Sequence, residues 1–422
     1  MKRSKLIMMA VVFLFLFSDY ELWAGTSVYS PAGWGGRATG MGGAGVATVN
    51  DCAAMIYNPA AITRIERKRV DIGMGILRPW KLYFRNQWND QAKCSTRRYY
   101  APQSGYVQNL ENSPVSIGAG LFFTYGAGSE WDFNTPFFNE TKQASSKAGI
   151  IKITPTIAYQ WSEHLSVGFT FDINYGKVQL QGPFGPVYMD VASADGWGCG
   201  FAIGVLYEPT NRLSLGLSYT SETNLDDLKS SRATLELSPY YPDPALGGSV
   251  WQYNDARVID FQQPCTLAAG IGYRFTDYFL VGLDCSWRNY ADTLENLKIE
   301  LSGGTGPDQT MIIPTRANNT FSVMLGAELK LTRNLTFRAG YCHDTKVSPD
   351  DRILYMAYMA GKGRTAAVGL GWQWDFYSVD IAWSRHFRDV AETGTSKFAP
   401  EFDNSVIEYG MDSWVLTVSK VF

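Results

Sequence analysis

Residues of the kinds that most often catalyse reactions or bind metals are few and scattered along this chain. The three histidines are isolated from one another, and the six cysteines form no CxxC pair and no spacing that suits a metal ion. No grouping of serine, histidine and aspartate is evident. In an exported chain the cysteines can still form disulfides. We therefore expect a protein that is not an enzyme and that carries no metal and no cofactor.

Another set of charged side chains follows a regular pattern in the C-terminal half. Each member falls on the polar side of a segment in which polar and apolar residues alternate. Most lie on consecutive segments, so opposite charges can pair. Charges of this kind line the interior of membrane barrels, and we interpret them mainly as ladders that hold a polar lumen. The residues are Asp284, Arg288, Glu328, Lys330, Arg338, Asp375 and Asp380.

The segments that carry these charges are predicted to be β-strands. Alternation begins at Arg69, and in Phe279 to Arg288 every second residue from Phe279 onward is apolar. A soluble sandwich shows the same alternation. A sandwich rarely keeps this alternation over so many strands, with Trp and Tyr near the strand ends, whereas a membrane barrel does. We predict 14 strands, near residues 69–83, 97–107, 114–126, 151–161, 165–180, 196–207, 212–221, 257–275, 279–290, 319–331, 335–343, 364–375, 378–387 and 412–422.

The connections between the predicted strands alternate in length. Two of the long ones cover residues 221–257 and 290–318. Short periplasmic turns that alternate with long external loops are typical of an outer-membrane barrel. A parallel α/β fold would show no such alternation. The short connections fall at residues 161–165, 208–212, 275–278, 331–334 and 375–377.

The N-terminus has the pattern of a secretory signal peptide. Basic residues at positions 2, 3 and 5 precede an uncharged apolar run of 12 residues, Leu6 to Phe17, and Ala24 is a plausible cleavage point. A run of that length is too short to span a bilayer as a helix. Cleavage after Ala24 leaves 34 basic and 38 acidic residues, a net charge of −4. A nucleic-acid partner, which would need a basic patch, is therefore not expected.

The C-terminus resembles the terminal strand of bacterial outer-membrane barrels. Trp414, Leu416 and Val418 alternate with polar residues, and the chain stops on Phe422. Lys420 departs from the pattern, because that position is usually apolar. We expect export to the outer membrane of a Gram-negative bacterium.

Residues 25–64 lack strand alternation and are rich in Gly and Ala. Few of them are charged, so a solvated tail is not expected, and small side chains suit a segment that is packed inside a barrel. Asn58, Pro59 and Ala60 form a turn or helix-end signal. The plain alternative is a turn before the first strand.

The same segment resembles the start of the FadL/TodX family of outer-membrane transporters for long-chain fatty acids and other hydrophobic compounds. The resemblance rests on Ser30, Gly33 and the run Gly36-Arg37-Ala38, followed by Asn58-Pro59-Ala60. One extra residue beside Gly35 departs from the family pattern. Residues 197–208, 213–222 and 338–344 are similar to the family's sixth, seventh and eleventh strands.

The resemblance covers essentially the whole mature chain and implies an all-β fold. It implies a 14-stranded antiparallel transmembrane β-barrel, residues 65–422, with an N-terminal hatch, residues 25–64, in the lumen. Residues 1–24 are the signal peptide. The implied function is uptake of hydrophobic compounds by passive diffusion. Asn58, Pro59 and Ala60 would gate the hatch, and ligand would leave sideways at a kink in the third strand, near Gly126 and Gly128. Without the resemblance, these are equally glycines at a strand end.

The resemblance also suggests where a ligand binds. An outer groove would be built from Tyr240, Tyr241, Leu246, Trp251 and Tyr253, unless these residues only pack the loops against one another. Family members that carry fatty acids place basic side chains near the ligand carboxylate.

In this chain the positions of those basic side chains hold Gly182 and Ile313. Lys177 and Arg316 are the nearest substitutes. This difference weakens the case for a fatty acid and strengthens that for a neutral hydrocarbon or aromatic ligand. The resemblance itself still favours long-chain fatty acids slightly.

The expected partners are a hydrophobic small molecule, outer-membrane lipid and lipopolysaccharide, and the barrel-assembly machinery. We expect the protein to be a monomer. Two alternatives stay open, an outer-membrane lipid-modifying enzyme and a secreted β-sandwich adhesin. Solubility that depends on detergent would separate a barrel from the adhesin, and hydrolysis of a lipid would indicate the enzyme.

Overall fold

The structure is a computed structural model that describes residues 33–95, 98–352 and 363–422. The predicted signal peptide and the first part of the predicted hatch, residues 25–32, lie outside the described residues. Among those described, no helix is long and apolar enough to cross a bilayer.

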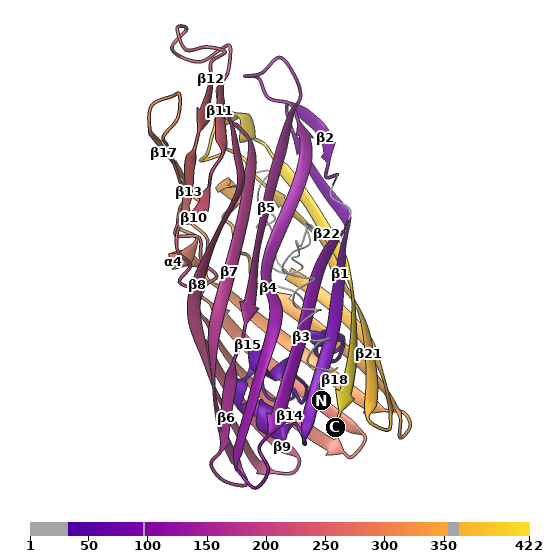
Figure 1. Cartoon of the computed structure of the whole chain (residues 1–422). Helices are drawn as coiled ribbons and strands as arrows, with labels where there is room; N and C mark the ends of the chain where they lie inside the picture. The colour runs from indigo at the N-terminus through magenta and orange to yellow at the C-terminus, as the bar shows by residue number, and fades with distance from the viewer. Residues whose placement is uncertain (1–32, 96–97, 353–362) are drawn as a thin grey trace.

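Strands form nearly the whole wall of the molecule (Figure 1). Within the described residues, antiparallel pairing joins 14 positions into one ring, as predicted, with β5 and β6 together filling the fourth. Pro155, which has no N–H to donate, lies in the break between those two. The wall consists of β1 (Lys68–Asn86), β3 (Tyr99–Asn109), β4 (Val115–Phe133), β5 (Lys142–Ile153), β6 (Thr156–Gln160), β7 (Leu165–Phe184), β8 (Val187–Thr210), β9 (Leu213–Thr220), β14 (Thr266–Thr276), β15 (Phe279–Arg288), β18 (Thr320–Lys330), β19 (Leu335–Asp344), β20 (Gly363–Trp374), β21 (Tyr377–Glu392) and β22 (Val406–Val421).

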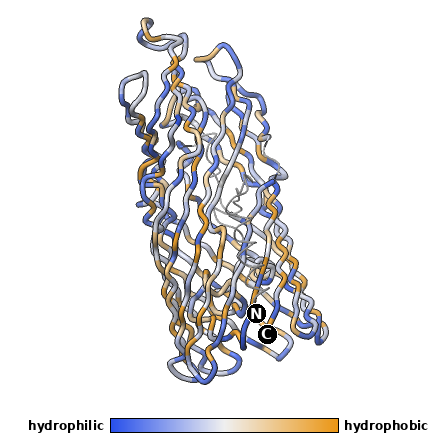
Figure 2. Tube along the Cα trace, viewed as in Figure 1, coloured by the Kyte–Doolittle hydropathy of each residue, from blue (hydrophilic) through white to orange (hydrophobic). Residues whose placement is uncertain are grey.

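The first and last strands of the wall close the ring. β1 pairs with β22 from Arg69, opposite Val421, to Arg85, opposite Val406, with one register shift after Pro79. Pairing of the first and last strands removes the two edges that an open sheet would have. The predicted sidedness of the strands is also present: Leu416 on β22 is exposed, whereas its neighbour Val415 is buried. Apolar and polar residues alternate along the wall in Figure 2, as a surface between lipid and lumen requires.

The connections at the two ends of the barrel differ, as their lengths predict. The short turns lie at the same end as the C-terminus (Figure 1). At the other end the long connections build more sheet rather than irregular loops. The added elements are β2 (Asn89–Lys93), β10 (Leu228–Ser230), β11 (Ala233–Leu237), β12 (Val250–Tyr253), β13 (Asp255–Ile259), α4 (Tyr290–Thr293), β16 (Leu297–Ser302), β17 (Gln309–Ile313), η2 (Asp350–Arg352) and η3 (Pro400–Phe402).

One predicted strand, 257–275, is two strands in the structure. β13 pairs with β16 in the outer extension, whereas β14 pairs with β9 and β15 in the wall. The break between them contains Asp260, whose φ is +54°, and Pro264. A left-handed residue and a residue without an N–H both interrupt a ladder. Even-numbered residues are the less exposed ones in both β13 and β14, so the parity of the inward residues did not reveal the break.

The segment before β1 is folded inside the lumen. It contains α2 (Gly35–Gly40), α3 (Ala54–Tyr57) and the 3-10 helix η1 (Pro59–Arg64), and nearly all its residues are buried. α2 packs against β19 to β22, and η1 packs against β6, β7 and β8 on the other side. Small residues permit this approach: a Cβ on Gly36 would lie 2.5 Å from the carbonyl oxygen of Asp380. We call residues 33–64 the hatch.

Candidate functional site

A buried chain of charges fixes the hatch to the wall. Glu328 on β18 accepts hydrogen bonds from Arg37 of α2, at 2.9 Å, and from Arg338 on β19, at 2.8 Å. Arg338 also donates to Asp380 on β21, at 2.6 Å. All four side chains are buried. Of the seven residues predicted to form the charge ladder, Glu328, Arg338 and Asp380 therefore pair with one another, and a hatch residue joins them. Lys330 and Asp375, which the sequence placed in the same ladder, are exposed near the short turns.

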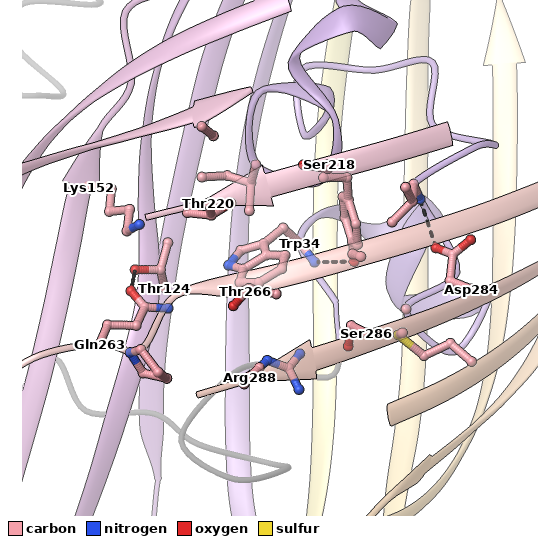
Figure 3. Close-up of a pocket in the computed structure, with 18 of the residues that line it drawn as sticks. Trp34, Thr124, Lys152, Ser218, Thr220, Gln263, Thr266, Asp284, Ser286 and Arg288 are labelled. Carbon is pink, nitrogen blue, oxygen red and sulfur yellow. Dashed lines mark hydrogen bonds between the residues drawn. The ribbon is translucent and has the colours of Figure 1, made fainter. Parts of the chain in front are cut away.

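A second contact joins the hatch to β15. One carboxylate oxygen of Asp284 accepts from the backbone N–H groups of Gly45, at 2.6 Å, and Val46, at 2.7 Å (Figure 3). The other oxygen has no hydrogen-bond partner among the described residues. Asp284 is fully buried, so this carboxylate depends on the two hatch donors for its solvation.

Asn58, Pro59 and Ala60 lie against the wall on β7 and β8. The Asn58 amide donates to the carbonyl oxygens of Val46 and Val205, each at 3.0 Å, and its oxygen accepts from the Ala60 N–H at 3.2 Å. A Cβ on Gly204 would lie 2.0 Å from the Asn58 oxygen. The motif therefore holds the two halves of the hatch together and seats them on the wall. Its gating role stays a prediction.

Above the hatch lies a cavity of about 100 Å³. Trp34, Met55 and Tyr57 of the hatch line one side of it. Strands β4, β5, β7, β8, β9, β14, β15, β18 and β19 and the connection before β14 also line it. Figure 3 shows Trp34 in the middle, Asp284 to one side, and Lys152, Thr124 and Gln263 to the other.

The cations that line this cavity are already engaged by wall residues. Lys152 is paired with Asp172 at 3.0 Å, and both side chains are almost completely buried. Arg288 donates to the Ser322 hydroxyl at 2.8 Å. Asp172, Asp284 and Asp344 line the same cavity, so carboxylates outnumber cations there.

The strand-3 glycines lie next to an irregularity in the wall. Gly126 and Gly128 on β4 pair regularly with Gly149 and Lys147 on β5, but the register slips between Phe123 and Tyr125. On its other side β4 pairs with β3 only as far as Phe122. Among the described residues, the β3 ladder thus ends and the β5 register shifts immediately before the two glycines, while the Tyr99 hydroxyl donates to the Gly128 carbonyl. Their role in an exit route stays a prediction.

The five predicted groove residues have different surroundings. Tyr253 is buried, and its hydroxyl donates to the carbonyl oxygen of Pro307 at 3.0 Å. Tyr240 is 59% exposed, and its hydroxyl donates to Asn139 at 2.9 Å. Tyr241, Leu246 and Trp251 are half-buried. Tyr253 thus packs the outer extension, whereas the other four have surface on which a ligand can lie.

The two basic residues proposed to meet a carboxylate lie away from the cavity. Lys177 is on the exposed face of β7, and Arg316 is exposed in the connection before β18. Neither lines the central cavity. The positions that hold a base in fatty-acid carriers contain Gly182, on β7, and the buried Ile313, on β17. Contact of Lys177 or Arg316 with a ligand stays a prediction.

Sequence reasoning missed the cavity residues Trp34, Lys152 and Asp172. Trp34 stands inside the Gly-rich motif, where its size is the only signal. Asp172 falls on the inward side of the predicted strand 165–180, so its position in the alternation could have identified it as a residue that faces the lumen. Lys152 was placed on a predicted strand without being singled out as inward-facing.

Comparisons with known proteins agree with this architecture. A sequence profile described as outer membrane protein transport protein (OMPP1/FadL/TodX) matches residues 23–419. The long-chain fatty acid transport protein of Escherichia coli O6:H1 is 22% identical over 367 residues, 77% of each chain. Outer membrane protein P1 of Haemophilus influenzae is 23% identical over 330 residues, 68% of this chain and 67% of that protein.

Solved structures share the fold. The toluene transporter TodX of Pseudomonas putida superposes with a TM-score of 0.77 at 22% identity, over 93% of this chain and 99% of its own. The toluene transporter TbuX of Ralstonia pickettii gives a TM-score of 0.72 at 19% identity, over 93% and 99% of the two chains. With the profile match over almost the whole length, these results show that the chain belongs to the OMPP1/FadL/TodX family of outer-membrane transport proteins.

Proposed function

We propose that this protein carries hydrophobic small molecules across the outer membrane by passive diffusion. The ligand meets the aromatic residues of the outer extension, enters the cavity above the hatch, and leaves sideways near Gly126 and Gly128. The observation that carries the proposal is a cavity enclosed between a hatch and a wall whose pairing is interrupted at β4. The hatch and the wall do not supply an enzymatic step in this account.

Transport of apolar molecules needs such a route for a physical reason. A water-filled pore does not desolvate an apolar solute, whereas burial of apolar surface contributes about 25 cal/mol per Å². Half-buried aromatic side chains such as Trp251 offer that surface outside the barrel. A lateral exit returns the molecule to lipid without passage through water.

The cavity favours a neutral ligand over a carboxylate. Lys152 is held by Asp172 at 3.0 Å, and three carboxylates line the space. A fatty-acid head group placed there would meet like charges, and each cation that lines the cavity among the described residues already has a wall partner. The relatives include proteins named for toluene and one named for long-chain fatty acids. We propose a neutral aromatic or hydrocarbon ligand first and a long-chain fatty acid second.

Replacement of both Gly126 and Gly128 by Val tests the exit route. A Cβ on Gly128 would lie 3.2 Å from the Tyr99 ring, so side chains there fill the space beside the gap. We expect uptake of labelled toluene by cells to fall, while binding to the outer extension of the purified protein persists. Unchanged uptake in the double variant would exclude an exit at this place.

A further inference from the structure

Trp34 of the hatch lies between two cavities. It lines the central cavity and also a smaller one of about 10 Å³, next to Ala101 and Pro102 of β3 and Phe123 of β4. Its backbone N–H donates to the Tyr57 hydroxyl at 3.2 Å, and the two rings meet edge to face at 5.3 Å. Tyr57 directly precedes Asn58. Trp34 therefore contacts the central cavity (Figure 3), the residue before the hatch motif, and the seam between β3 and β4.

The seam lacks one hydrogen-bond donor for a reason that is visible in the sequence. The β3–β4 ladder ends with Gln103 opposite Phe122. Extended by one residue, its register would set Pro102 opposite Phe123, and both residues line the same small cavity. In an antiparallel ladder, successive residues of a strand face opposite neighbours. The Asn109 N–H donates to Arg67, at the start of β1, so even-numbered residues of β3, Pro102 included, face β4.

The same parity fixes the orientation of β4. The Gly120 carbonyl accepts from Thr154, on the side of the fourth wall position, so Phe123 faces β3. The donor that the ladder would supply to the Phe123 carbonyl is therefore the N–H of residue 102. Proline has none.

Trp34 supplies the missing donor. Its indole Nε1 lies 3.1 Å from the carbonyl oxygen of Phe123 and donates to it. Phe123 is only 1% exposed, so an unpaired carbonyl there would be costly. The next residue, Thr124, is where the register slips on the other side of β4. The indole thus satisfies the Phe123 carbonyl, which the backbone of β3 cannot do because residue 102 is proline.

We propose that Trp34 is the latch of the lateral exit. In the closed state its indole N–H takes the place of the missing ladder bond, and a ligand that displaces the ring from the central cavity frees the seam. Trp34 is a positioning residue, because it acts on the exit through β3 and β4. This inference rests on the proposed lateral route and adds the group that regulates it.

The experiment separates the hydrogen bond from the bulk of the side chain. Trp34→Phe keeps an aromatic ring beside Tyr57 and removes the donor, and Pro102→Ala gives the ladder an N–H of its own. Trp414→Phe, on the exposed face of β22, is the matched control. The readouts are amide hydrogen exchange of residues 99–101 and 123–127 in detergent, and cellular uptake of labelled toluene.

We expect Trp34→Phe to speed exchange at the seam and to raise uptake by about two- to ten-fold, the factor that one hydrogen bond contributes to an equilibrium. Adding Pro102→Ala to this variant should return exchange to the native rate and lower uptake. Trp414→Phe should match the native protein. Heat-modifiable mobility on a detergent gel shows whether each variant folds. If Trp34→Phe does not fold, Pro102→Ala alone still tests the latch, because it should slow both amide exchange at the seam and uptake of toluene.

One result would exclude the latch role of Trp34, and another would contradict the proposed transport function. Native exchange and native uptake in Trp34→Phe, alongside reduced uptake in the Gly126/Gly128 double variant, would exclude the latch and keep the exit. Absence of uptake by the native protein would contradict the proposed function, while the exchange comparison would still decide whether Trp34 closes the seam.

Discussion

Arg37 in the hatch and Glu328 in the wall are 291 residues apart in sequence and meet at 2.9 Å in the lumen. The same Glu328 oxygen accepts from Arg338, so one carboxylate joins the hatch to two neighbouring strands. Removal of one member of a buried ion pair costs much more than the pair contributes, because it leaves a charge without solvation. The contact therefore makes the position of α2 sensitive to a single substitution.

Glu328→Gln should loosen the hatch. It leaves Arg37 with a weaker partner in a dry site, and we expect the hatch to lose about 3 kcal/mol or more of its attachment. Hydrogen exchange of residues 35–49 in detergent measures the loss. Lys330→Gln, at an exposed position on the same strand, is the control and should leave exchange unchanged. Equal exchange in both variants would show that the charge chain does not hold the hatch.

Asn58 offers a test of the hatch motif that is finer than its removal. Deletion of Asn58, Pro59 and Ala60 should impair uptake while the barrel still folds and reaches the surface. Asn58→Ala removes the donors to the Val46 and Val205 carbonyls and should destabilise the hatch by about 1–3 kcal/mol. Uptake of toluene and gel mobility of unboiled protein are the measurements. Native uptake in the deletion variant would exclude a gating role.

The charge of the ligand can be tested by competition. We expect purified protein to bind a fatty acid and its methyl ester with equal affinity, and to bind toluene in the same cavity, because the cations there are engaged by the wall. Fluorescence of Trp34, read against Trp34→Phe, reports binding. A fatty acid that binds about ten-fold more tightly than its ester would reveal a basic anchor worth about 1.4 kcal/mol. Lys177 and Arg316 would then be the first residues to substitute.

The outer end contains a carboxylate that should respond to pH. Glu401 in η3 is 2% exposed, and burial raises its pKa above the usual 4.5. One of its oxygens accepts from the Gly185 N–H, and the other has no partner among the described residues. The Glu401 carboxylate therefore binds a proton more tightly when the connection between β21 and β22 is folded than when it is unfolded.

The sign of the effect follows from that difference. Stability of the connection between β21 and β22 should be full below pH 4.5 and should fall as the pH rises through the elevated pKa of Glu401. Limited proteolysis within residues 393–405 measures it, and Glu401→Gln should remove the dependence. Faster cleavage at pH 4 than at pH 8 would contradict the assignment.

Much of the fold could be predicted from sequence because a barrel repeats one local rule. Leu283 and Asp284 point to opposite sides of β15, and period-2 alternation predicts this without knowledge of any neighbour. The break between β13 and β14 was missed because its cause is local backbone geometry, and the inward residues have the same parity on both sides of it.

The site is harder to predict, because its contacts join residues far apart in the chain. Trp34 and Phe123 are 89 residues apart, and nothing in either local pattern pairs them. Pro102 was visible, but its missing N–H matters only once the register, extended by one residue, places it opposite Phe123. Motif reasoning pointed to Asn58 and the Gly126 region, whose roles stay predictions, whereas the partners of those residues required the structure.

The most direct test of the account is to fill the cavity and measure transport. Thr266 on β14 lines it, and Thr266→Trp should occupy the space, whereas Thr276→Trp lies at the exposed end of the same strand. Initial uptake of labelled toluene by cells that carry each variant is the measurement, with surface amounts matched. The account predicts uptake near background for Thr266→Trp and native uptake for Thr276→Trp. Native uptake in Thr266→Trp would show that hydrophobic molecules do not pass through this cavity.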